Sequence, residues 1–352
     1  MRHIIELQQQ LLPDLLDVMR KRYMILHQVM LSDLIGRRSL AAALAMTERV
    51  LRAETDFLKS QGLLEIHTAG MRISDAGRTL LEQLEPFYKT MFGLSDLEEK
   101  IRSAFGLSQV VIVPGDSEGS VPTKRELGRA ACQVLRKVMK PNDVVAVTGG
   151  TTIAQVANQL TSTASLKTNW FVPARGGLGE SLDYQANTIA SNMAKRTGAN
   201  YRLLHVPDHL GNEAFASIMQ EPNIREIVEV IRSSRIVVHG IGDAMVMARR
   251  RRLDSEIIEG MAAEGALAEA FGYYFDRNGE VVHKMQTVGL RLEDIVKTEV
   301  VIGVAGGQGK GDAIAAVMRF GHNDVLVTDE AAALEIVSNL EKHEESNAED
   351  KS

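Results

Sequence analysis

The amino-acid sequence predicts an α/β protein built from an N-terminal winged helix-turn-helix and a C-terminal Rossmann-like, doubly wound parallel sheet. Short helical patterns and a hairpin fill the first 88 residues, and short apolar runs alternate with helical patterns from residue 107 to residue 340. Charge also separates the two parts, because residues 1–90 hold 12 Lys and Arg against 11 Asp and Glu, whereas the rest holds 28 against 35. This asymmetry indicates that the two parts bind different partners.

The composition excludes several classes of protein. With 352 residues, 45% of them hydrophobic, the chain is too apolar to be disordered, and its net charge of −6 leaves only local basic surfaces. A single cysteine, Cys132, excludes an intramolecular disulfide framework and a multi-cysteine zinc site. We expect a cytoplasmic protein without a membrane segment, because Glu6 and three glutamines interrupt the N-terminus and no run of about 18 apolar residues occurs.

The first part has the order of elements that is typical of a winged helix-turn-helix. Thr47 offers an N-cap for its second short helix, and Gly62 suits the left-handed position after that helix ends. We expect a helix over 7–26 interrupted near Pro13, helices over 35–44 and 47–61, strands over 63–66 and 71–73, and a helix capped by Asp75.

A local basic patch coincides with this motif. Between Arg20 and Arg52 the sequence has seven basic and two acidic residues. The second helix of such a motif enters the major groove of DNA, and arginine binds guanine through two hydrogen bonds. We expect Thr47, Glu48, Arg49 and Arg52 at the base edges and phosphates, with Arg37 and Arg38 on the DNA backbone. The alternative is a three-helix protein-interaction domain with solvated arginines.

Between and after these parts lie two further segments. Apolar residues continue through residues 89–106 as a linker helix and possible dimer contact, and Pro86 is expected to bend or break the helical run before it. Residues 341–352 are almost wholly polar and predict a disordered tail. The predicted organisation is therefore a DNA-binding domain over 1–88, a linker helix over 89–106, an effector and oligomerisation domain over 107–340, and the tail.

The second part contains short buried strands, which predict a parallel sheet. A ligand of such a sheet binds beyond the carboxyl ends of its strands. The runs are 110–113, 144–147, 170–172, 236–238, 301–304 and 325–327.

One strand end predicts a phosphate-binding turn. The strand over 144–147 leads through Thr148 into Gly149, Gly150, Thr151 and Thr152 at the start of a helix. Glycines let the backbone approach an oxyanion, hydroxyls donate hydrogen bonds, and the helix N-terminus adds partial positive charge. The turn is neither a Walker A loop nor a dinucleotide fingerprint. A purely structural strand-to-helix turn is the alternative.

Other strand ends bring charged residues toward the same crevice. Arg175 and Lys310 lie on glycine-rich loops after their strands, and Glu269 is an acceptor suited to sugar hydroxyls, unless it is a surface carboxylate. The run Arg249–Arg252 is interpreted mostly as a solvated helix face, and an inward orientation of one member is the alternative.

Signs of catalysis are weak. Residues 115–119 match the G-x-S-x-G pattern, but the sharp strand-to-helix turn of a hydrolase is missing, so a solvated loop is the better interpretation. Asp208 and His209 share a proline-containing loop and are expected to be solvated, and no metal-ligand spacing occurs. We therefore expect no catalytic residues, no metal and no cofactor.

Several strings of residues are specific enough to suggest a family. The strings are GRRSL (36–40), ERVLR (48–52), VTGGTT (147–152), VPARGGLGE (172–180), VHGIG (238–242), EAFGYY (269–274) and VTDE (327–330). They resemble the SorC group of sugar-responsive bacterial transcriptional repressors, and within it the members that control glycolysis. The resemblance covers almost the whole chain, and the long strings of the second part are more specific than the helix-turn-helix.

The resemblance implies a homodimeric or homotetrameric repressor of the operon for glyceraldehyde-3-phosphate dehydrogenase and later glycolytic enzymes, released from double-stranded operator DNA by fructose 1,6-bisphosphate. Its effector domain is related to sugar-phosphate isomerases. The site that it implies comprises Gly149, Gly150, Thr151, Thr152, Arg175, Gln185, Arg250, Glu269 and Lys310. The alternatives are an isomerase-like enzyme with a DNA-binding arm, and an activator that senses another sugar phosphate.

Overall fold

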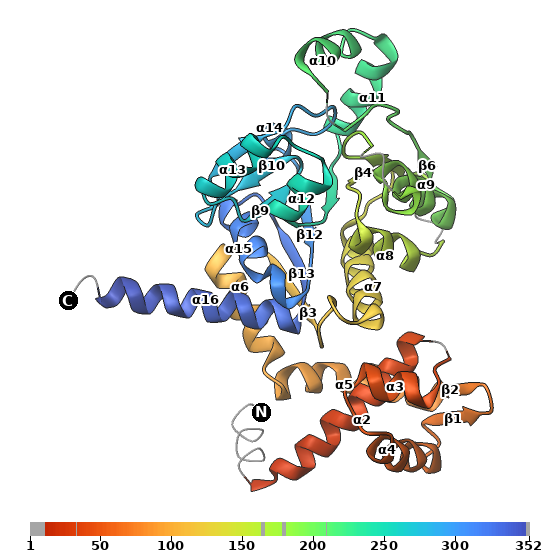
Figure 1. Cartoon of the computed structure of the whole chain (residues 1–352). Coiled ribbons are helices and arrows are strands. Elements are labelled where there is room, and N and C mark those ends of the chain that lie inside the picture. Colours follow the sequence, from red (N-terminus) through yellow and green to blue (C-terminus); the bar gives the residue numbers. More distant parts are fainter. Residues whose placement is uncertain (1–10, 33, 163–165, 178–180, 209, 350–352) are drawn as a thin grey trace. The chain divides into compact units, whose positions relative to one another are not determined.

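The computed structural model describes residues 11–32, 34–162, 166–177, 181–208 and 210–349 (Figure 1). Its contacts divide the chain into two compact units, Met1–Asp96 and Leu97–Ser352. Each unit has its own buried apolar side chains, as expected for two independent cores.

The first unit has the predicted winged helix-turn-helix order. Tyr23 of its first described helix stacks on Tyr88 with ring centroids 3.7 Å apart, and Leu40, Leu51 and Met71 are buried with them. The hairpin pairs Leu64 with Ile73 in antiparallel register. The elements are α2 (Pro13–Ser32), α3 (Arg37–Ala43), α4 (Glu48–Ser60), β1 (Leu64–His67), β2 (Gly70–Ile73) and α5 (Asp75–Met91).

The predicted helix ends of this unit are partly confirmed. The Thr47 hydroxyl accepts from Val50 N–H at 3.4 Å as the cap of α4, and Gly62 has the expected left-handed φ of 71°. The predicted cap of α5 is wrong by one residue, because Ser74 accepts from Gly77 N–H and Asp75 is already helical.

The segment predicted as a single linker helix contains two helices. Helix α5 continues through Pro86 to Met91, and α6 (Leu94–Phe105) follows after Gly93, whose φ is 74°. Glycine adopts this left-handed conformation without steric cost, so the helical run is interrupted at Gly93 and is not broken at Pro86.

The second unit is built on a seven-stranded parallel sheet. Its order is β3-β13-β12-β7-β4-β5-β6, and all six predicted strands are confirmed. Val147 pairs with both Val238 and Pro173, so three central strands end at the same level. The strands are β3 (Gln109–Val113), β4 (Val144–Val147), β5 (Trp170–Pro173), the unpredicted β6 (Asn200–Tyr201), β7 (Ile236–His239), β12 (Val300–Val304) and β13 (Val325–Asp329).

Helices connect and cover these strands. Gly128 of α7 lies so close to α8 that a Cβ there would meet the backbone of Gln155 at 2.7 Å, which explains a glycine at this helix crossing. The helices are α7 (Val121–Val138), α8 (Thr151–Gln159), η2 (Leu182–Tyr184), α9 (Ala186–Thr197), α10 (Asn212–Ile218), α11 (Pro222–Arg232), α12 (Ala244–Arg250), α13 (Ser255–Ala263), α14 (Leu292–Ile295), η3 (Gln308–Lys310), α15 (Gly311–Phe320) and α16 (Glu330–Glu349). Helix α16 runs through most of the segment predicted as a disordered tail, and residues 350–352 lie outside the described residues.

A second, antiparallel sheet was not predicted. It has the order β11-β10-β9-β8, with strands β8 (Gly242–Asp243), β9 (Ala268–Ala270), β10 (Tyr273–Phe275) and β11 (Val281–Lys284). Phe271 and Gly272, both at positive φ, form the two-residue turn between β9 and β10. This sheet packs with α12 and α13 around the buried Tyr274, and Glu269 lies in its strand β9.

Two general features of the described residues bear on function. None of their helices has the length and apolar character needed to cross a membrane. They also contain no cluster of three or more His, Cys, Asp or Glu side chains able to hold a metal ion.

Candidate functional site

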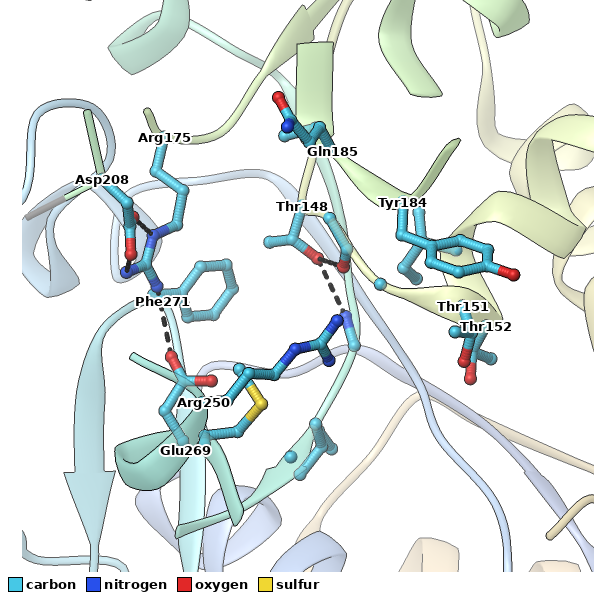
Figure 2. Close-up of a pocket in the computed structure, with 18 of the residues that line it drawn as sticks. Thr148, Thr151, Thr152, Arg175, Tyr184, Gln185, Asp208, Arg250, Glu269 and Phe271 are labelled. Atoms are coloured by element: carbon cyan, nitrogen blue, oxygen red, sulfur yellow. Dashed lines mark hydrogen bonds and ion pairs between the residues drawn. The ribbon is translucent and has the colours of Figure 1, made fainter. Parts of the chain in front are cut away.

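A pocket lies where the central strands of the parallel sheet end and meet β8 and β9 of the small sheet (Figure 2). It encloses about 940 Å³ when the space at its open mouth is included. All nine effector-site residues implied by the family resemblance line this one pocket: Gly149, Gly150, Thr151, Thr152, Arg175, Gln185, Arg250, Glu269 and Lys310.

The predicted phosphate-binding turn forms one wall. Gly149 passes so close to η2 that a Cβ would meet the Tyr184 carbonyl at 2.7 Å, and Gly150 has φ 120° and ψ 156°, which L-residues rarely adopt. The amide of Gly150 donates to that same carbonyl at 2.8 Å. No side chain among the described residues caps α8, so the amides of its first turn are available to an anion.

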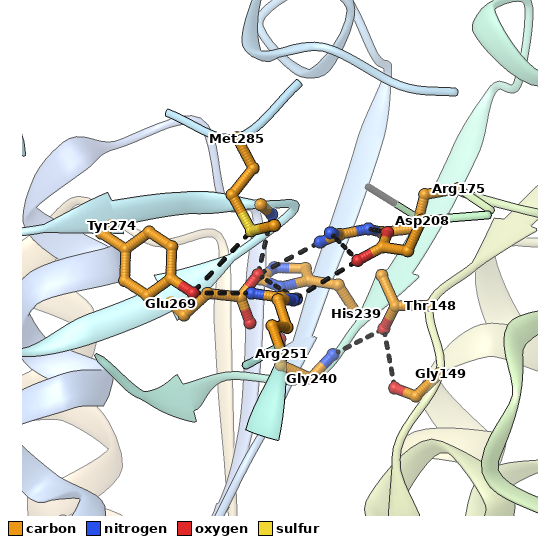
Figure 3. Close-up of polar contacts among 11 residues, drawn as sticks. Thr148, Gly149, Arg175, Asp208, His239, Gly240, Arg251, Glu269, Tyr274 and Met285 are labelled. Atoms are coloured by element: carbon orange, nitrogen blue, oxygen red, sulfur yellow. Dashed lines mark hydrogen bonds and ion pairs between the residues drawn. The ribbon is translucent and has the colours of Figure 1, made fainter. Parts of the chain in front are cut away.

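A threonine connects this turn to the loop after β7. Thr148 Oγ1 accepts from Gly240 N–H at 3.1 Å and donates to the Gly149 carbonyl at 3.3 Å (Figure 3). The two backbone segments that flank the start of α8 are therefore fixed relative to one another.

The opposite wall contains a buried cluster of four charged side chains, which we call the charge quartet: Arg175, Asp208, Arg251 and Glu269. Arg175 donates through Nε and Nη2 to the two oxygens of Asp208, and through Nη1 to Glu269 Oε1 at 3.1 Å. Arg251 donates through Nη2 to the same Oε1 at 2.8 Å, and its Nε lies 3.4 Å from Asp208 Oδ2 (Figure 3). The exposed fractions of the four side chains are 8%, 2%, 3% and 7% in the order named.

The quartet controls the ionisation of Glu269. Burial alone would raise the pKa of this carboxyl, but the charges of Arg251 and Arg175 and the amide of Gly272 lower it below its usual value. For Arg251, the charges of Glu269 and Asp208 outweigh burial and raise the pKa. Glu269 is thus held in its carboxylate form between the guanidinium groups of Arg175 and Arg251.

Two further cations, Arg250 and Lys310, line the pocket outside the quartet. Arg250, at the end of α12, is exposed, and Figure 2 shows its side chain reaching across the pocket from the side of Glu269. Lys310, at the end of η3, has a pKa below its usual value because of burial and the charge of Lys124, opposed by nearby carboxylates. An anion bound beside Lys310 would favour its charged form.

Two loop residues that the sequence indicated as solvated are buried. Asp208 is not solvated but almost completely buried against Arg175, whereas His209 lies outside the described residues. Ser117, in the loop interpreted as solvated, is also buried, and its amide donates to Asp329 Oδ2 at 2.8 Å. The partners of both residues are more than 30 positions away in the sequence, so no local pattern could have indicated these contacts.

Arg251 was missed as an individual site residue. The arginine run alone could not indicate which member turns inward, and the structure buries Arg251 and leaves Arg249, Arg250 and Arg252 more exposed. Arg252 has a φ of 54° just after α12 ends. Both Arg250 and Arg251 line the pocket, but only Arg251 belongs to the quartet.

The residues predicted to bind DNA lie on α3 and at the start of α4 in the first unit. Arg49 and Arg52 are exposed on α4, and exposed Arg38 lies 3.6 Å from Glu48. Arg37, the first residue of α3, is half-buried. Arg22 of α2 pairs with Glu54 at 2.8 Å and stacks over Phe57 at 3.7 Å from its centroid, which fixes α4 against α2.

Comparison with known proteins assigns both units. Residues 18–88 match the family model described as the CggR N-terminal DNA binding domain, and residues 89–338 match the one described as a sugar-binding domain. The chain is 49% identical over 338 residues to a curated protein of Priestia megaterium called Central glycolytic genes regulator, covering 96% of this chain and 99% of that protein. The protein of the same name from Bacillus subtilis is 46% identical over 337 residues, with the same coverage.

Solved structures agree with the fold. A SorC family transcriptional regulator from Enterococcus faecalis is 39% identical, with a TM-score of 0.64 over 69% of this chain and 99% of that one. The full-length sorbitol operon regulator SorC from Klebsiella pneumoniae has a TM-score of 0.65 over 85% of this chain and 92% of its own, and at 19% identity it shows the fold alone.

The winged helix-turn-helix and the pocketed α/β unit define a DNA-binding transcriptional regulator with a sugar-binding domain, and not an enzyme. More specifically, the chain belongs to the SorC family of sugar-binding regulators, of the central glycolytic genes regulator type.

Proposed function

We propose that this regulator represses the operon encoding glyceraldehyde-3-phosphate dehydrogenase and later glycolytic enzymes, and that fructose 1,6-bisphosphate releases it from operator DNA. The observation that carries the proposal is the composition of the pocket. The uncapped start of α8 and Lys310 suit phosphate, while Glu269 suits sugar hydroxyls. The names of the 49% and 46% identical relatives support the choice of a glycolytic operon.

The proposed effector site comprises the nine pocket residues named above. The first-turn amides and hydroxyls of Thr151 and Thr152 bind one phosphate. Arg250 and Lys310 supply cations for the two phosphates, and Glu269 and Gln185 bind hydroxyls of the sugar. Two phosphates are required for full induction, because the pocket has more anion-binding groups than one phosphate uses.

The proposed DNA contacts divide between base edges and backbone. Arg49 and Arg52, exposed on α4, read bases, and Thr47 and Glu48 lie at the start of the same helix. Arg37 and Arg38 position the DNA backbone. The regulator acts in the cytoplasm as a homodimer or homotetramer, since a two-fold assembly presents two recognition helices to a two-fold operator.

The rival function is that of an isomerase-like enzyme with a DNA-binding arm. Such an enzyme needs a base beside a sugar C–H. The described pocket lining includes no histidine, so Glu269 would have to serve as that base. His239 is buried under Phe271 at 4.4 Å between ring centroids and pairs with Asn323 at 2.7 Å. Its pKa is lowered by burial, and it does not line the pocket.

One experiment tests both readings. Operator duplexes selected by the protein from a random pool are titrated with fructose 1,6-bisphosphate and with fructose 6-phosphate, and free sugar is followed by NMR over hours. We expect release at lower concentrations of the bisphosphate, and unchanged sugar. Equal potency of the two sugars would refute the two-phosphate site, and conversion of the sugar would refute the sensor.

A further inference from the structure

Two members of the charge quartet, Asp208 and Arg251, are not among the nine residues of the proposed effector site. Both are 2–3% exposed, and their charged atoms contact other members of the quartet. Arg251 uses Nη2 for Glu269 and Nη1 for the Tyr274 hydroxyl at 3.1 Å, while its Nε faces Asp208. Asp208 uses both oxygens for Arg175.

The quartet joins four separate elements. Arg175 follows β5, Asp208 lies in the loop between β6 and α10, Arg251 follows α12, and Glu269 is in β9. Two positive and two negative charges balance, which is the condition under which buried ions are tolerated. Removal of one member leaves an unpaired buried charge, whereas removal of one cation together with one anion preserves the balance.

The geometry at Glu269 shows what this arrangement achieves. Its Oε1 accepts from Arg175 Nη1, from Arg251 Nη2 and from Gly272 N–H at 2.7 Å. Its Oε2 accepts no hydrogen bond from any described residue, although the side chain lines the pocket. One carboxylate oxygen is therefore fully occupied inside the protein, and the other is left as an ionised acceptor for a ligand.

We infer that Asp208 and Arg251 are positioning residues, which orient Arg175 and Glu269 so that Glu269 Oε2 faces the hydroxyl groups of the sugar phosphate. They select the polyol part of the ligand, whereas the turn at Gly149–Thr152 binds phosphate regardless of what it is attached to. This inference rests on the proposed function, because it requires a sugar phosphate in the pocket. It also explains the division between neighbours, with Arg251 inside the quartet and Arg250 exposed to the ligand.

The test compares two bisphosphates of similar length, fructose 1,6-bisphosphate and 1,6-hexanediol bisphosphate, which lacks the hydroxyls. Calorimetry measures both affinities for wild-type protein, Asp208→Asn, Arg251→Gln and the charge-balanced double variant. We expect wild type to favour the sugar at least about tenfold, the worth of one or two hydrogen bonds to a charged group. In the variants this preference falls to less than about threefold, while hexanediol bisphosphate binding is maintained.

The double variant keeps the test valid if a single variant does not fold, and thermal melting verifies folding in each case. Arg235→Gln is the matched control. Its guanidinium forms an ion pair of the same kind with Asp143 and Glu299 beside the amino ends of β4 and β12, outside the pocket. It should lower thermal stability and leave the preference unchanged.

The outcomes separate the inference from the proposed function. If wild type does not bind fructose 1,6-bisphosphate, both are refuted. If wild type prefers the sugar and the folded double variant retains that preference, only the positioning role of Asp208 and Arg251 is refuted. If the variants lose affinity equally for both bisphosphates, the two residues act on general pocket structure, and the inference is wrong.

Discussion

Substitution of Gly150 by alanine tests the phosphate-binding turn directly. Gly150 has φ 120° and ψ 156°, a conformation essentially restricted to glycine, and a Cβ there would meet no heavy atom within 4 Å. The change therefore causes no clash, and its effect on the free energy of unfolding is that of backbone strain alone. The new methyl group would also stand beside the first turn of α8, where we propose that a phosphate binds.

The expected magnitude follows from that conformation. A residue held in such a region costs about 1–3 kcal/mol, and both peptide groups of Gly150 are fixed, by the Tyr184 carbonyl at 2.8 Å and by the amide of Ala154 at 3.0 Å. Each kcal/mol lowers the Tm of a domain of this size by about 2–4 °C, so we expect a decrease of about 2–12 °C. We also expect affinity for fructose 1,6-bisphosphate to fall at least about tenfold.

The assay is thermal unfolding of Gly150→Ala with and without fructose 1,6-bisphosphate, together with operator binding in the absence of ligand. Gly211→Ala is the control, because Gly211 is also the N-cap of a helix and also has open space around it, but its φ of −66° suits alanine. It should shift stability by less than about 0.5 kcal/mol. Equal Tm values for the two variants would refute the strain argument, and an undiminished ligand-induced shift would refute a phosphate at this turn.

Three further predictions concern the proposed DNA-binding residues and the pocket. Arg49→Ala and Arg52→Ala should each reduce discrimination between operator and random DNA by about 1–3 kcal/mol. Arg37→Ala should mainly lower the slope of log affinity against log salt concentration by about 1. If Arg49→Ala and Arg52→Ala weaken binding to both DNAs equally, base readout is contradicted. Affinity for fructose 1,6-bisphosphate, measured by calorimetry from pH 7 to pH 10, should be greatest while Lys310 is protonated and should fall as the pH rises through its lowered pKa. Lys310→Met should remove this dependence. If Lys310→Met has the same pH profile as wild type, Lys310 is excluded from the site. Thr152→Val should give a repressor that binds operator normally but needs about tenfold more sugar phosphate for release, as measured by gel shift, and unchanged release would exclude the hydroxyl from the site.

The sequence was most informative where chemistry depends on neighbouring residues. The turn at Gly149–Thr152 could be predicted because its strand, its glycines and its helix start are contiguous. The six longer strands could be predicted for the same reason, since each is a short apolar run. The small sheet could not, because its strands have only two to four residues and pack against α12 and α13 through contacts distant in the sequence.

The charge quartet shows the limit of that reasoning. Asp208 and Glu269 are 33 and 94 positions from Arg175, so nothing local to Asp208 distinguishes it from a solvated loop carboxylate. Which member of the arginine run is buried likewise depends on where α12 ends against the small sheet. Residue types indicated the chemistry of the pocket, but the pairing of its charges could be recognised only in the folded structure.

The placement of the pocket residues has a consequence for regulation. The turn at Gly149–Thr152 belongs to the parallel sheet, whereas Glu269 and Arg250 belong to the small sheet and to α12 beside it. A ligand with phosphates at both ends would therefore contact both layers at once, while a monophosphate would contact one layer strongly and the other only through hydroxyls. An effector shifts a conformational equilibrium only by the difference in its affinity for the two states. If the spacing of the two layers differs between the DNA-binding state and the released state, a ligand that connects both layers has the larger difference in affinity between those states. For this physical reason we expect the bisphosphate, and not the monophosphate, to be the efficient inducer.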